Sequence, residues 1–255
     1  MESLLFIAVL PVFVICYFIY KKDSNKEPAG LLFKLLFFGM LSCFPAIILE
    51  IFLGSFFPIE EEMNTVTLFF YNFIVIAFVE ELCKFVFTYF GAYNHWEFTN
   101  LYDMMVFATF VSLGFALFEN ILYVFSGGFY VGIIRAIFAV PGHACDGLVM
   151  GYYLGLCKIA QYNNNSKLVK KNMFLSLFVP IIMHTFYDFC LSTNNVYLLI
   201  FWLMYVVWIY IFLFRKIKYI SMNVKDFVLE ADYCRQCGYK NGGQFCPMCG
   251  RKYNN

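Results

Sequence analysis

Two adjacent glutamates and a lysine lie in the middle of a long apolar stretch, residues 65–90, and are the residues of this chain best suited to chemistry. They are Glu80, Glu81 and Lys84. On a helix the lysine is four residues from one glutamate and three from the other, so it can reach either carboxylate. Charged groups inside an apolar span are costly unless they face a protein interior or a wet cavity. Two carboxylates beside an ammonium can supply both a proton acceptor and a proton donor, although the same group could be a buried ion pair that only fixes helix packing.

Three further apolar stretches also carry polar residues near their centres. These residues are Glu119 and Asn120, then His143 directly after Pro141-Gly142, then His184 and Asp188. The last two are four residues apart and share a helical face, so that the carboxylate can orient the imidazole and set its tautomer. Both glutamates of the first motif and both histidines lie about ten to fifteen residues into their stretches, and therefore at a similar depth. We expect one common cavity, opening toward the outer face of a membrane.

Small residues follow His143 at four-residue spacing. They are Gly147, Gly151 and Gly155. Such a row lets another helix approach to near backbone contact, so we expect His143 to be held at a tight helix crossing. Two other polar residues, Asp103 near a helix end and Arg135, are expected to be structural, the arginine pairing with Asp146 or reaching the membrane interface.

The composition places the chain among membrane proteins. Hydrophobic residues make up 62% of it and charged residues only 14%, with a mean hydropathy of +0.71, which a soluble domain of this length does not show. A net charge of +1 gives no reason to expect nucleic acid as a partner. Apolar runs of about 20 residues, long enough to span, fall at 3–20, 30–53, 65–90, 101–125, 129–157, 172–192 and 196–214. We therefore predict an all-α polytopic protein of the lipid bilayer with about seven transmembrane helices.

Basic residues concentrate in the connections after the first, fifth and seventh runs, which lie on one side if there are seven spans. They are Lys21, Lys22 and Lys26, then Lys158, Lys167, Lys170 and Lys171, then Arg215, Lys216 and Lys218. The positive-inside rule then predicts that the N-terminus is outside and the C-terminus in the cytosol. The richness in Phe, Ile, Asn and Lys is typical of an AT-rich bacterial genome, which favours a bacterial cell membrane.

The C-terminal tail is predicted to be a separate small unit. Two CxxCG knuckles supply its four cysteines, Cys234, Cys237, Cys246 and Cys249. Two such turns complete a tetrahedral Cys₄ shell that suits zinc, and disulfides are disfavoured on a reducing cytosolic side. We predict a transmembrane domain over residues 1–218, a linker over 219–230 and a structural zinc ribbon over 231–253 that could recruit a cytosolic partner.

The ordered set of intramembrane motifs resembles one known family. The motifs are Glu80-Glu81-x-x-Lys84, Phe115-x-x-x-Glu119-Asn120, Pro141-Gly142-His143-Ala144 with Gly147, and His184-x-x-x-Asp188. Over about residues 30–214 they resemble the PrsW family of polytopic membrane proteases and, more distantly, are similar to the CAAX-prenyl and bacteriocin-processing membrane proteases. The resemblance implies site-1 cleavage of a single-pass membrane protein, such as an anti-sigma factor in stress signalling, near or just outside the outer membrane surface. The zinc ribbon lies outside the shared core.

Peptide hydrolysis needs an activated water, a group that stabilises the oxyanion and an acid for the leaving amine. We expect either Glu80 or Glu81 to be the general base. His143 and His184 are expected to serve the oxyanion or the leaving group. The remaining polar residues are expected to orient or complete the site: Lys84, Glu119, Asn120 and Asp188.

A metal-dependent mechanism is compatible with the same residues. Two imidazoles and a carboxylate, here from His143, His184 and Glu119, would form a catalytic zinc site with an open position for water and a remaining glutamate as base. Spacing does not separate the two mechanisms, because each ligand comes from a different helix and no HExxH motif is present.

Two other classes of protein use similar features. An ion- or proton-coupled transporter or channel also contains buried acids, histidines and lysines, but no inverted repeat relates the two halves of this chain. A non-catalytic scaffold would leave the cost of burying these residues unexplained. The sequence therefore favours a membrane protease.

Overall fold

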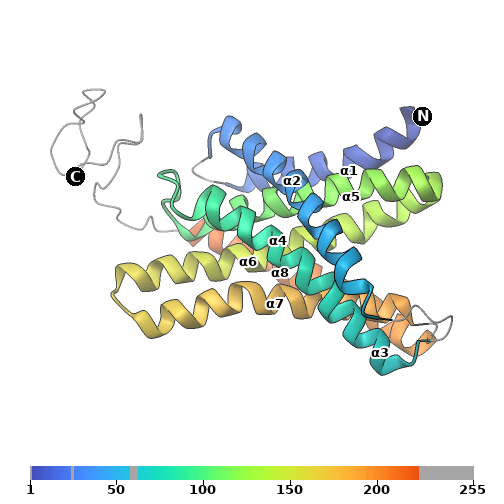
Figure 1. Cartoon of the computed structure of the whole chain (residues 1–255). Helices are drawn as coiled ribbons and strands as arrows, with labels where there is room; N and C mark the ends of the chain where they lie inside the picture. The colour runs from blue at the N-terminus through green and yellow to red at the C-terminus, as the bar shows by residue number, and fades with distance from the viewer. Residues whose placement is uncertain (1, 24–25, 58–62, 194, 224–255) are drawn as a thin grey trace, which may run out of the picture.

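The computed structural model describes residues 2–23, 26–57, 63–193 and 195–223, and every regular element among them is helical (Figure 1). The elements are α1 (Glu2–Lys22), α2 (Ala29–Gly54), α3 (Thr65–Phe70), η1 (Tyr71–Ala77), α4 (Phe78–Thr88), η2 (Tyr89–Tyr93), α5 (Leu101–Ile137), α6 (Ala139–Tyr162), α7 (Ser166–Ser192) and α8 (Val196–Asn223). The predicted zinc ribbon lies outside the described residues.

Six helical stretches among the described residues are long and apolar enough to cross a membrane. Five of them correspond to single predicted spans. The predicted fourth and fifth spans instead fall together in one stretch of 62 residues, Leu101–Tyr162, which comprises α5 and α6. The prediction of an all-α polytopic protein is thus confirmed.

Helix α5 turns back on itself at Gly128. This residue has φ 81° and ψ −173°, a conformation that glycine adopts without the penalty of a Cβ atom. The turn brings Arg135 to 2.8 Å from Glu119, sixteen residues earlier, whereas sixteen residues of straight helix would separate them by about 24 Å. The segment between the predicted spans 101–125 and 129–157 is therefore a sharp reversal of the chain.

The first half of α5 is the centre of the fold. Residues Tyr102–Leu117 are buried without interruption, because α1, α2 and α6 all pack against this helix. Its start is fixed by a capping box, in which the Asn100 side chain accepts hydrogen bonds from the backbone N–H groups of Tyr102 and Asp103 and the Asp103 carboxylate accepts one from Asn100. The expectation that Asp103 lies near a helix end is confirmed.

Glycines permit two close helix crossings on α5. A Cβ atom at Gly114 would collide with the carbonyl oxygen of Leu36 in α2, and one at Gly39 would collide with the backbone of α5. On the other side, a Cβ atom at Gly151 in α6 would collide with the backbone at Met104. The glycine row of α6 therefore forms a tight helix crossing, as expected.

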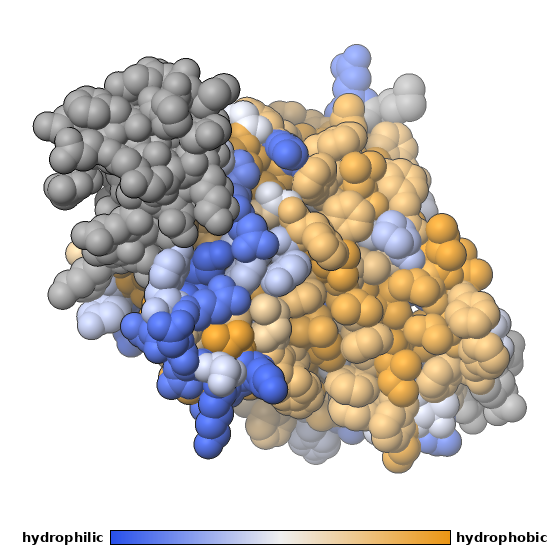
Figure 2. Space-filling model, turned by 60° about the vertical axis from the view of Figure 1, so that its left-hand side comes forward, coloured by the Kyte–Doolittle hydropathy of each residue, from blue (hydrophilic) through white to orange (hydrophobic). Residues whose placement is uncertain are grey.

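The connections are sorted between the two ends of the bundle (Figure 1). The α1–α2, η2–α5 and α6–α7 connections lie at the same end of the bundle as the end of α8, whereas the reversal within α5 and the α7–α8 connection lie at the other end. Figure 2 shows hydrophilic residues gathered at one end of the face it displays, while hydrophobic residues cover most of the rest. An apolar belt with a polar end is the surface expected of a membrane protein.

The glutamate pair lies on an irregular helix. The run Thr65–Tyr93 is a single candidate span in which the π-helical segments η1 and η2 flank α4 on both sides. Such π-bulges are rare and frequently occur at functional sites. They flank the segment that carries Glu80 and Glu81 in its first turn.

Candidate active site

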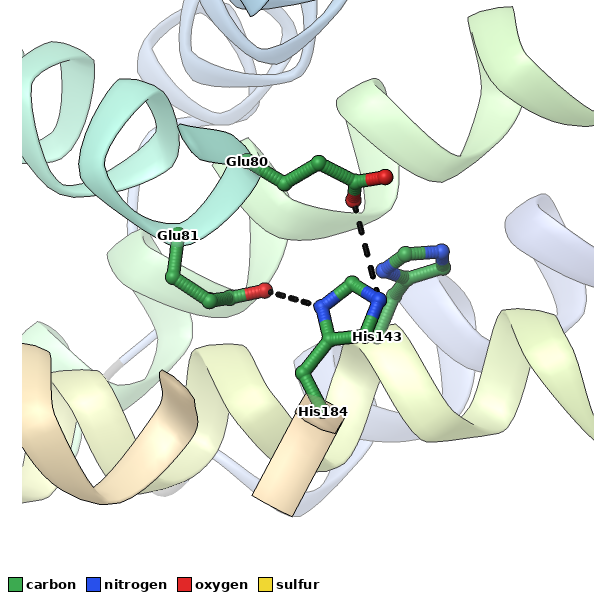
Figure 3. A group of neighbouring side chains, drawn as sticks. All are labelled: Glu80, Glu81, His143 and His184. Atoms are coloured by element: carbon green, nitrogen blue, oxygen red, sulfur yellow. Dashed lines mark hydrogen bonds and ion pairs between the residues drawn. The ribbon is translucent and has the colours of Figure 1, made fainter. Parts of the chain in front are cut away.

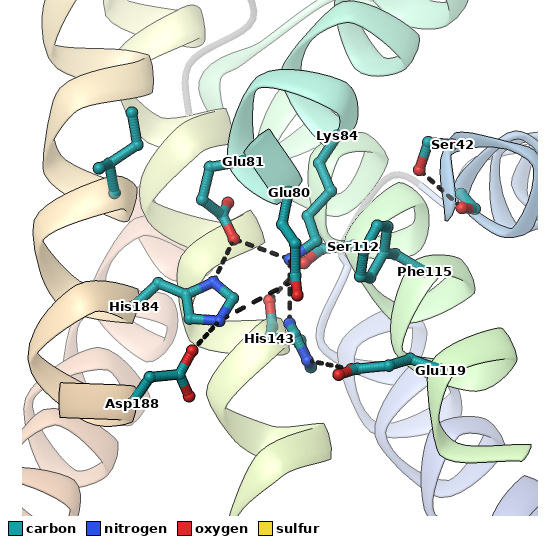
Figure 4. Close-up of polar contacts among 12 residues, drawn as sticks. Ser42, Glu80, Glu81, Lys84, Ser112, Phe115, Glu119, His143, His184 and Asp188 are labelled. Atoms are coloured by element: carbon teal, nitrogen blue, oxygen red, sulfur yellow. Dashed lines mark hydrogen bonds and ion pairs between the residues drawn. The ribbon is translucent and has the colours of Figure 1, made fainter. Parts of the chain in front are cut away.

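Helix α4 places a buried ion-pair cluster in the middle of the bundle. The Lys84 ammonium donates hydrogen bonds to Glu80 Oε2 at 3.0 Å and to Glu81 Oε1 at 2.7 Å, and all three side chains are buried (Figure 4). Its nitrogen also lies 4.2 Å from the centre of the Phe115 ring on α5, a cation–π contact. The lysine thus contacts both carboxylates, where the sequence showed only that it could reach either.

His143 connects this cluster to a second one. Its Nδ1 lies 3.1 Å from the Lys84 ammonium, and its Nε2 lies 2.9 Å from Glu119 Oε2. Because an ammonium can only donate, Nδ1 accepts and Nε2 carries the proton that is donated to Glu119. The Ser112 hydroxyl donates to the backbone carbonyl of His143 at 2.6 Å, which fixes the imidazole-bearing turn of α6 against α5.

His184 on α7 is held by carboxylates on both of its ring nitrogens. Nδ1 lies 2.9 Å from Glu81 Oε1 and Nε2 lies 3.9 Å from Glu80 Oε2 (Figure 3), and Nε2 also lies 3.1 Å from Asp188 Oδ2 (Figure 4). The ring is also in edge-to-face contact with the ring of His143, with centroids 5.4 Å apart. The predicted pairing of His184 with Asp188 on one helical face is present.

A cavity of about 290 Å³ opens beside these groups. Five of the predicted site residues line it: Glu80, Glu119, His143, His184 and Asp188. Aromatic side chains make up much of the remaining wall: Tyr123, Tyr187, Tyr205 and Tyr210. The residues Glu81 and Lys84 lie behind the wall and support it. Asn120 also lies behind it, where its amide donates to the Ala8 carbonyl of α1 at 2.7 Å.

Arg135 has a role in the site that was not predicted from the sequence. Its guanidinium donates to Glu119 Oε2 at 2.8 Å and to Asn120 Oδ1 at 2.9 Å, and it lines the cavity. The ion pair of Arg135 is with Glu119 and not, as expected, with Asp146, which lines the same cavity. The cost of an arginine within an apolar stretch was the signal that could have identified it, because such residues normally face a functional cavity.

The donor atoms of the site suit a metal ion. One ligand atom from each of Glu80, Glu81, His143 and His184 lies within 4.8 Å of the others. The second oxygen of Glu81, Oε2, is buried without a hydrogen-bond partner among the described residues. Imidazole and carboxylate donors in this number are those of zinc and related ions. The Lys84 ammonium contacts three of the same groups, so it would compete with a metal ion for them.

This donor set shares both histidines with the predicted one but differs from it in its carboxylates. Glu119, which the sequence analysis grouped with the two histidines, contacts Nε2 of His143, on the other side of the ring from Lys84. It therefore orients that imidazole, as carboxylates behind metal-ligating histidines commonly do. The two glutamates of α4 take its place in the donor set.

Buried acids and imidazoles from four helices, facing one cavity within an apolar bundle, define a membrane-embedded protein equipped for hydrolysis. The profile of the PrsW family intramembrane metalloproteases matches residues 27–214 of the chain. The chain therefore belongs to the PrsW family of intramembrane proteases and is a membrane-embedded hydrolase.

Curated relatives agree with this assignment over most of their length. The chain is similar to Protease PrsW of Oceanobacillus iheyensis, with 36% identity over 200 residues, which cover 78% of this chain and 88% of that protein. Protease PrsW of Bacillus subtilis is 30% identical over 211 residues, or 82% of this chain and 92% of that protein. Protease PrsW of Clostridioides difficile is 28% identical over 231 residues, or 88% and 94%. No solved structure gives a significant match.

Proposed function

We propose that the chain is an endopeptidase that makes the site-1 cut in a single-pass membrane protein, such as an anti-sigma factor, near the outer surface of a bacterial membrane. The observation that carries this proposal is that Glu80, His143 and His184 face one cavity together. A volume of about 290 Å³ admits a short unwound segment and a water molecule, but no folded domain. A single-pass helix with a flexible juxtamembrane segment is a substrate of suitable shape.

Glu80 is proposed as the general base. Its carboxylate lines the cavity and its side chain is 7% exposed, whereas that of Glu81 is 0% exposed. The Oε1 atom of Glu81 is already held by Lys84 and His184. Glu80 is thus placed to take a proton from water, while Glu81 keeps the lysine and the imidazole in position.

The two histidines are proposed to act on opposite sides of the scissile bond. His184 has carboxylates on both ring nitrogens, an arrangement that suits delivery of a proton to the leaving amine. His143, backed by Glu119 and close to the Lys84 ammonium, is placed to stabilise the oxyanion.

The donor set also fits a catalytic metal, with His143, His184 and Glu81 as ligands and Glu80 left as the base. A metal bound there would polarise the scissile carbonyl and make a coordinated water more acidic. Asp188 and Glu119 would then fix the orientation of the two imidazoles from behind.

For the membrane arrangement we propose seven crossings, because Leu101–Tyr162 reverses at Gly128. The N-terminus would be outside and the C-terminus cytosolic, since the lysine-bearing connections share one end of the bundle. The cysteines Cys234, Cys237, Cys246 and Cys249 would hold a structural zinc in a ribbon over residues 231–253, after a linker over 219–230. The ribbon would bind a cytosolic partner or affect abundance without taking part in the chemistry.

The test uses two purified proteins, the full chain and a variant that ends after residue 223, so that metal in the active site can be counted separately from metal in the tail. The full chain should contain one more zinc per molecule than the shortened chain. If the shortened chain contains a metal that is lost with His143→Ala or His184→Ala, the metal mechanism is supported. If the unsubstituted shortened chain contains no metal, a glutamate-activated water alone is supported.

Cleavage of a single-pass reporter substrate by the same proteins tests the catalytic assignment. Removing a general base costs about a hundred- to ten-thousand-fold, so Glu80→Gln should lower the rate by this factor. Phe90→Leu, at an 83% exposed position of η2, controls for perturbation of the same span. If a correctly inserted Glu80→Gln variant cuts at the parent rate, Glu80 is not part of the mechanism. If Glu81→Gln also cuts at the parent rate, the proposed protease mechanism is wrong.

A further inference from the structure

A second group of acidic residues is gathered far from the catalytic cavity. Asp23 follows the end of α1, Glu27 precedes the start of α2, and Asp103 lies in the first turn of α5. One carboxylate oxygen from each lies within 4.8 Å of the others, and the three residues are 5%, 3% and 0% exposed. Glu119 of the active site is sixteen residues further along the chain from Asp103, or about 24 Å of helix. We call this group the α1–α2 acidic cluster.

Two oxygens of the cluster are buried and unsatisfied. Asp103 Oδ2 accepts three hydrogen bonds, from the backbone N–H groups of Thr99 and Asn100 and from the Thr99 hydroxyl, at 2.7–2.9 Å. Its other oxygen, Oδ1, and Glu27 Oε2 are buried and have no hydrogen-bond partner among the described residues. A buried carboxylate oxygen without a partner is costly and calls for an ion, a water or a proton at that position.

The nearby lysines are directed elsewhere. Lys21 lies over the ring of Tyr17 and Lys26 over the ring of Tyr20, with both lysines exposed. In the described part of the chain the ion pairs of lysine and arginine side chains involve the catalytic glutamates and Glu119, and none involves Glu27 or Asp103. The negative charge of these two carboxylates is therefore not balanced by a basic side chain.

We propose that the α1–α2 acidic cluster is a binding site for a hard divalent cation, Mg²⁺ or Ca²⁺, formed by Asp23, Glu27 and Asp103. Carboxylate oxygens in this number are the ligands that these two ions prefer. The bound ion would join two chain segments, because Asp23 and Glu27 lie on the α1–α2 connection and Asp103 lies in the first turn of α5. It would fix the α1–α2 connection to the start of α5, the central helix, and so stabilise the fold without touching the catalytic groups.

The experiment measures thermal unfolding of the full chain in detergent, at a constant low free zinc concentration, while Mg²⁺ and Ca²⁺ are titrated separately. A ligand that binds only the folded state raises the midpoint of unfolding. We expect one of the two ions to raise it by several degrees, with saturation at one ion per chain in equilibrium dialysis. Lys26→Gln, which changes charge next to the cluster without removing a ligand, should keep the response, and Glu27→Gln should lose it.

The alternative to a cation is a proton shared between Glu27 and Asp103. A glutamine closely resembles a protonated glutamate, so under this alternative Glu27→Gln would be as stable as the parent and neither protein would respond to either ion. That result, or an equal response in the parent and in Glu27→Gln, would overturn the proposal. Asp23→Asn provides a second variant, and if neither variant folds, the absence of bound Mg²⁺ or Ca²⁺ in dialysis of the parent would overturn it as well.

Discussion

The ammonium nitrogen of Lys84 lies 3.1 Å from Nδ1 of His143, although 59 residues separate them in the chain. The contact joins the glutamate motif of α4 to the histidine of α6. It also fixes which nitrogen of His143 carries a proton, and hence its hydrogen bond to Glu119. A single buried lysine thereby positions two glutamates and one imidazole.

Replacing this lysine should be destabilising as well as inactivating. Lys84→Met leaves Glu80 and Glu81 buried without their cation, and breaking a buried ion pair in this way costs about 3–5 kcal/mol. Thermal unfolding in detergent measures the loss. Lys34→Met, at an exposed position of α2, is the matched control and should change stability little. If the two variants were equally stable, another cation would have to occupy the position of the Lys84 ammonium.

Replacing Glu80 and replacing Glu81 should have different effects on stability and activity. Glu81→Gln should lower both stability and activity, because the 0% exposed carboxylate holds Lys84 and His184. Glu80→Gln should lower activity by about a hundred-fold or more with a smaller loss of stability, since its carboxylate faces the cavity. Unfolding midpoints and single-turnover cleavage of both variants test this. A Glu80→Gln variant that is the less stable of the two would contradict the assignment of roles.

The chemistry of the site could be predicted from the sequence because charged residues inside apolar spans have few purposes. Glu80, Glu81, His143 and His184 were identified from residue type and depth alone, and their donor atoms indeed lie close together. The helical spacing also predicted the contacts within one helix, from Lys84 to the glutamates and from His184 to Asp188.

Contacts between helices were less predictable, since residue spacing along a helix does not tell how two helices are rotated against each other. Arg135 reaches Glu119 only because the chain reverses at Gly128 with a left-handed backbone conformation. A Gly-Gly pair such as Gly127-Gly128 marks a turn, but it shows neither how sharp the turn is nor which face of α5 meets the returning helix. For the same reason the sequence did not show that Glu119 contacts Nε2 of His143, on the other side of the ring from Lys84.

Asp188 is expected to act by positioning His184. Asp188→Asn keeps the size of the side chain but weakens the bond to Nε2, which is 3.1 Å long. Loss of such an orienting carboxylate typically costs about ten- to a hundred-fold in activity or metal affinity. The rate constant kcat should fall with little change in KM, and the pH–rate profile should shift, whereas a purely structural role would change only the amount of folded protein. Restoration of part of the rate in Asp188→Glu would support the positioning role, and an unchanged pH profile in Asp188→Asn would argue against it.

The crossing of α2 and α5 should tolerate no side chain at Gly114. A Cβ atom there would collide with the Leu36 carbonyl, which belongs to the backbone and cannot rotate away. Overpacking of this kind costs about 1–3 kcal/mol, so Gly114→Ala should lower the unfolding midpoint clearly. Gly30→Ala, where a Cβ atom would meet nothing within 4 Å, is the control. Equal stability of the two variants would mean that the helices can separate at this point without cost.

The reversal at Gly128 makes the number of crossings testable. If Leu101–Tyr162 crosses the membrane twice, Ser126 lies at the outer surface and Asn164 at the cytosolic one, and both are exposed. Single cysteines at these positions, in a chain whose native cysteines have been replaced, should therefore react differently with a membrane-impermeant thiol reagent added to intact cells. Ser126→Cys should be labelled directly and Asn164→Cys only after the membrane is permeabilised. A Ser126→Cys variant that reacts under neither condition would place this residue within the bilayer, and the stretch would then cross only once. The reverse labelling pattern would place the C-terminal tail outside, where a reduced Cys₄ zinc ribbon is not expected.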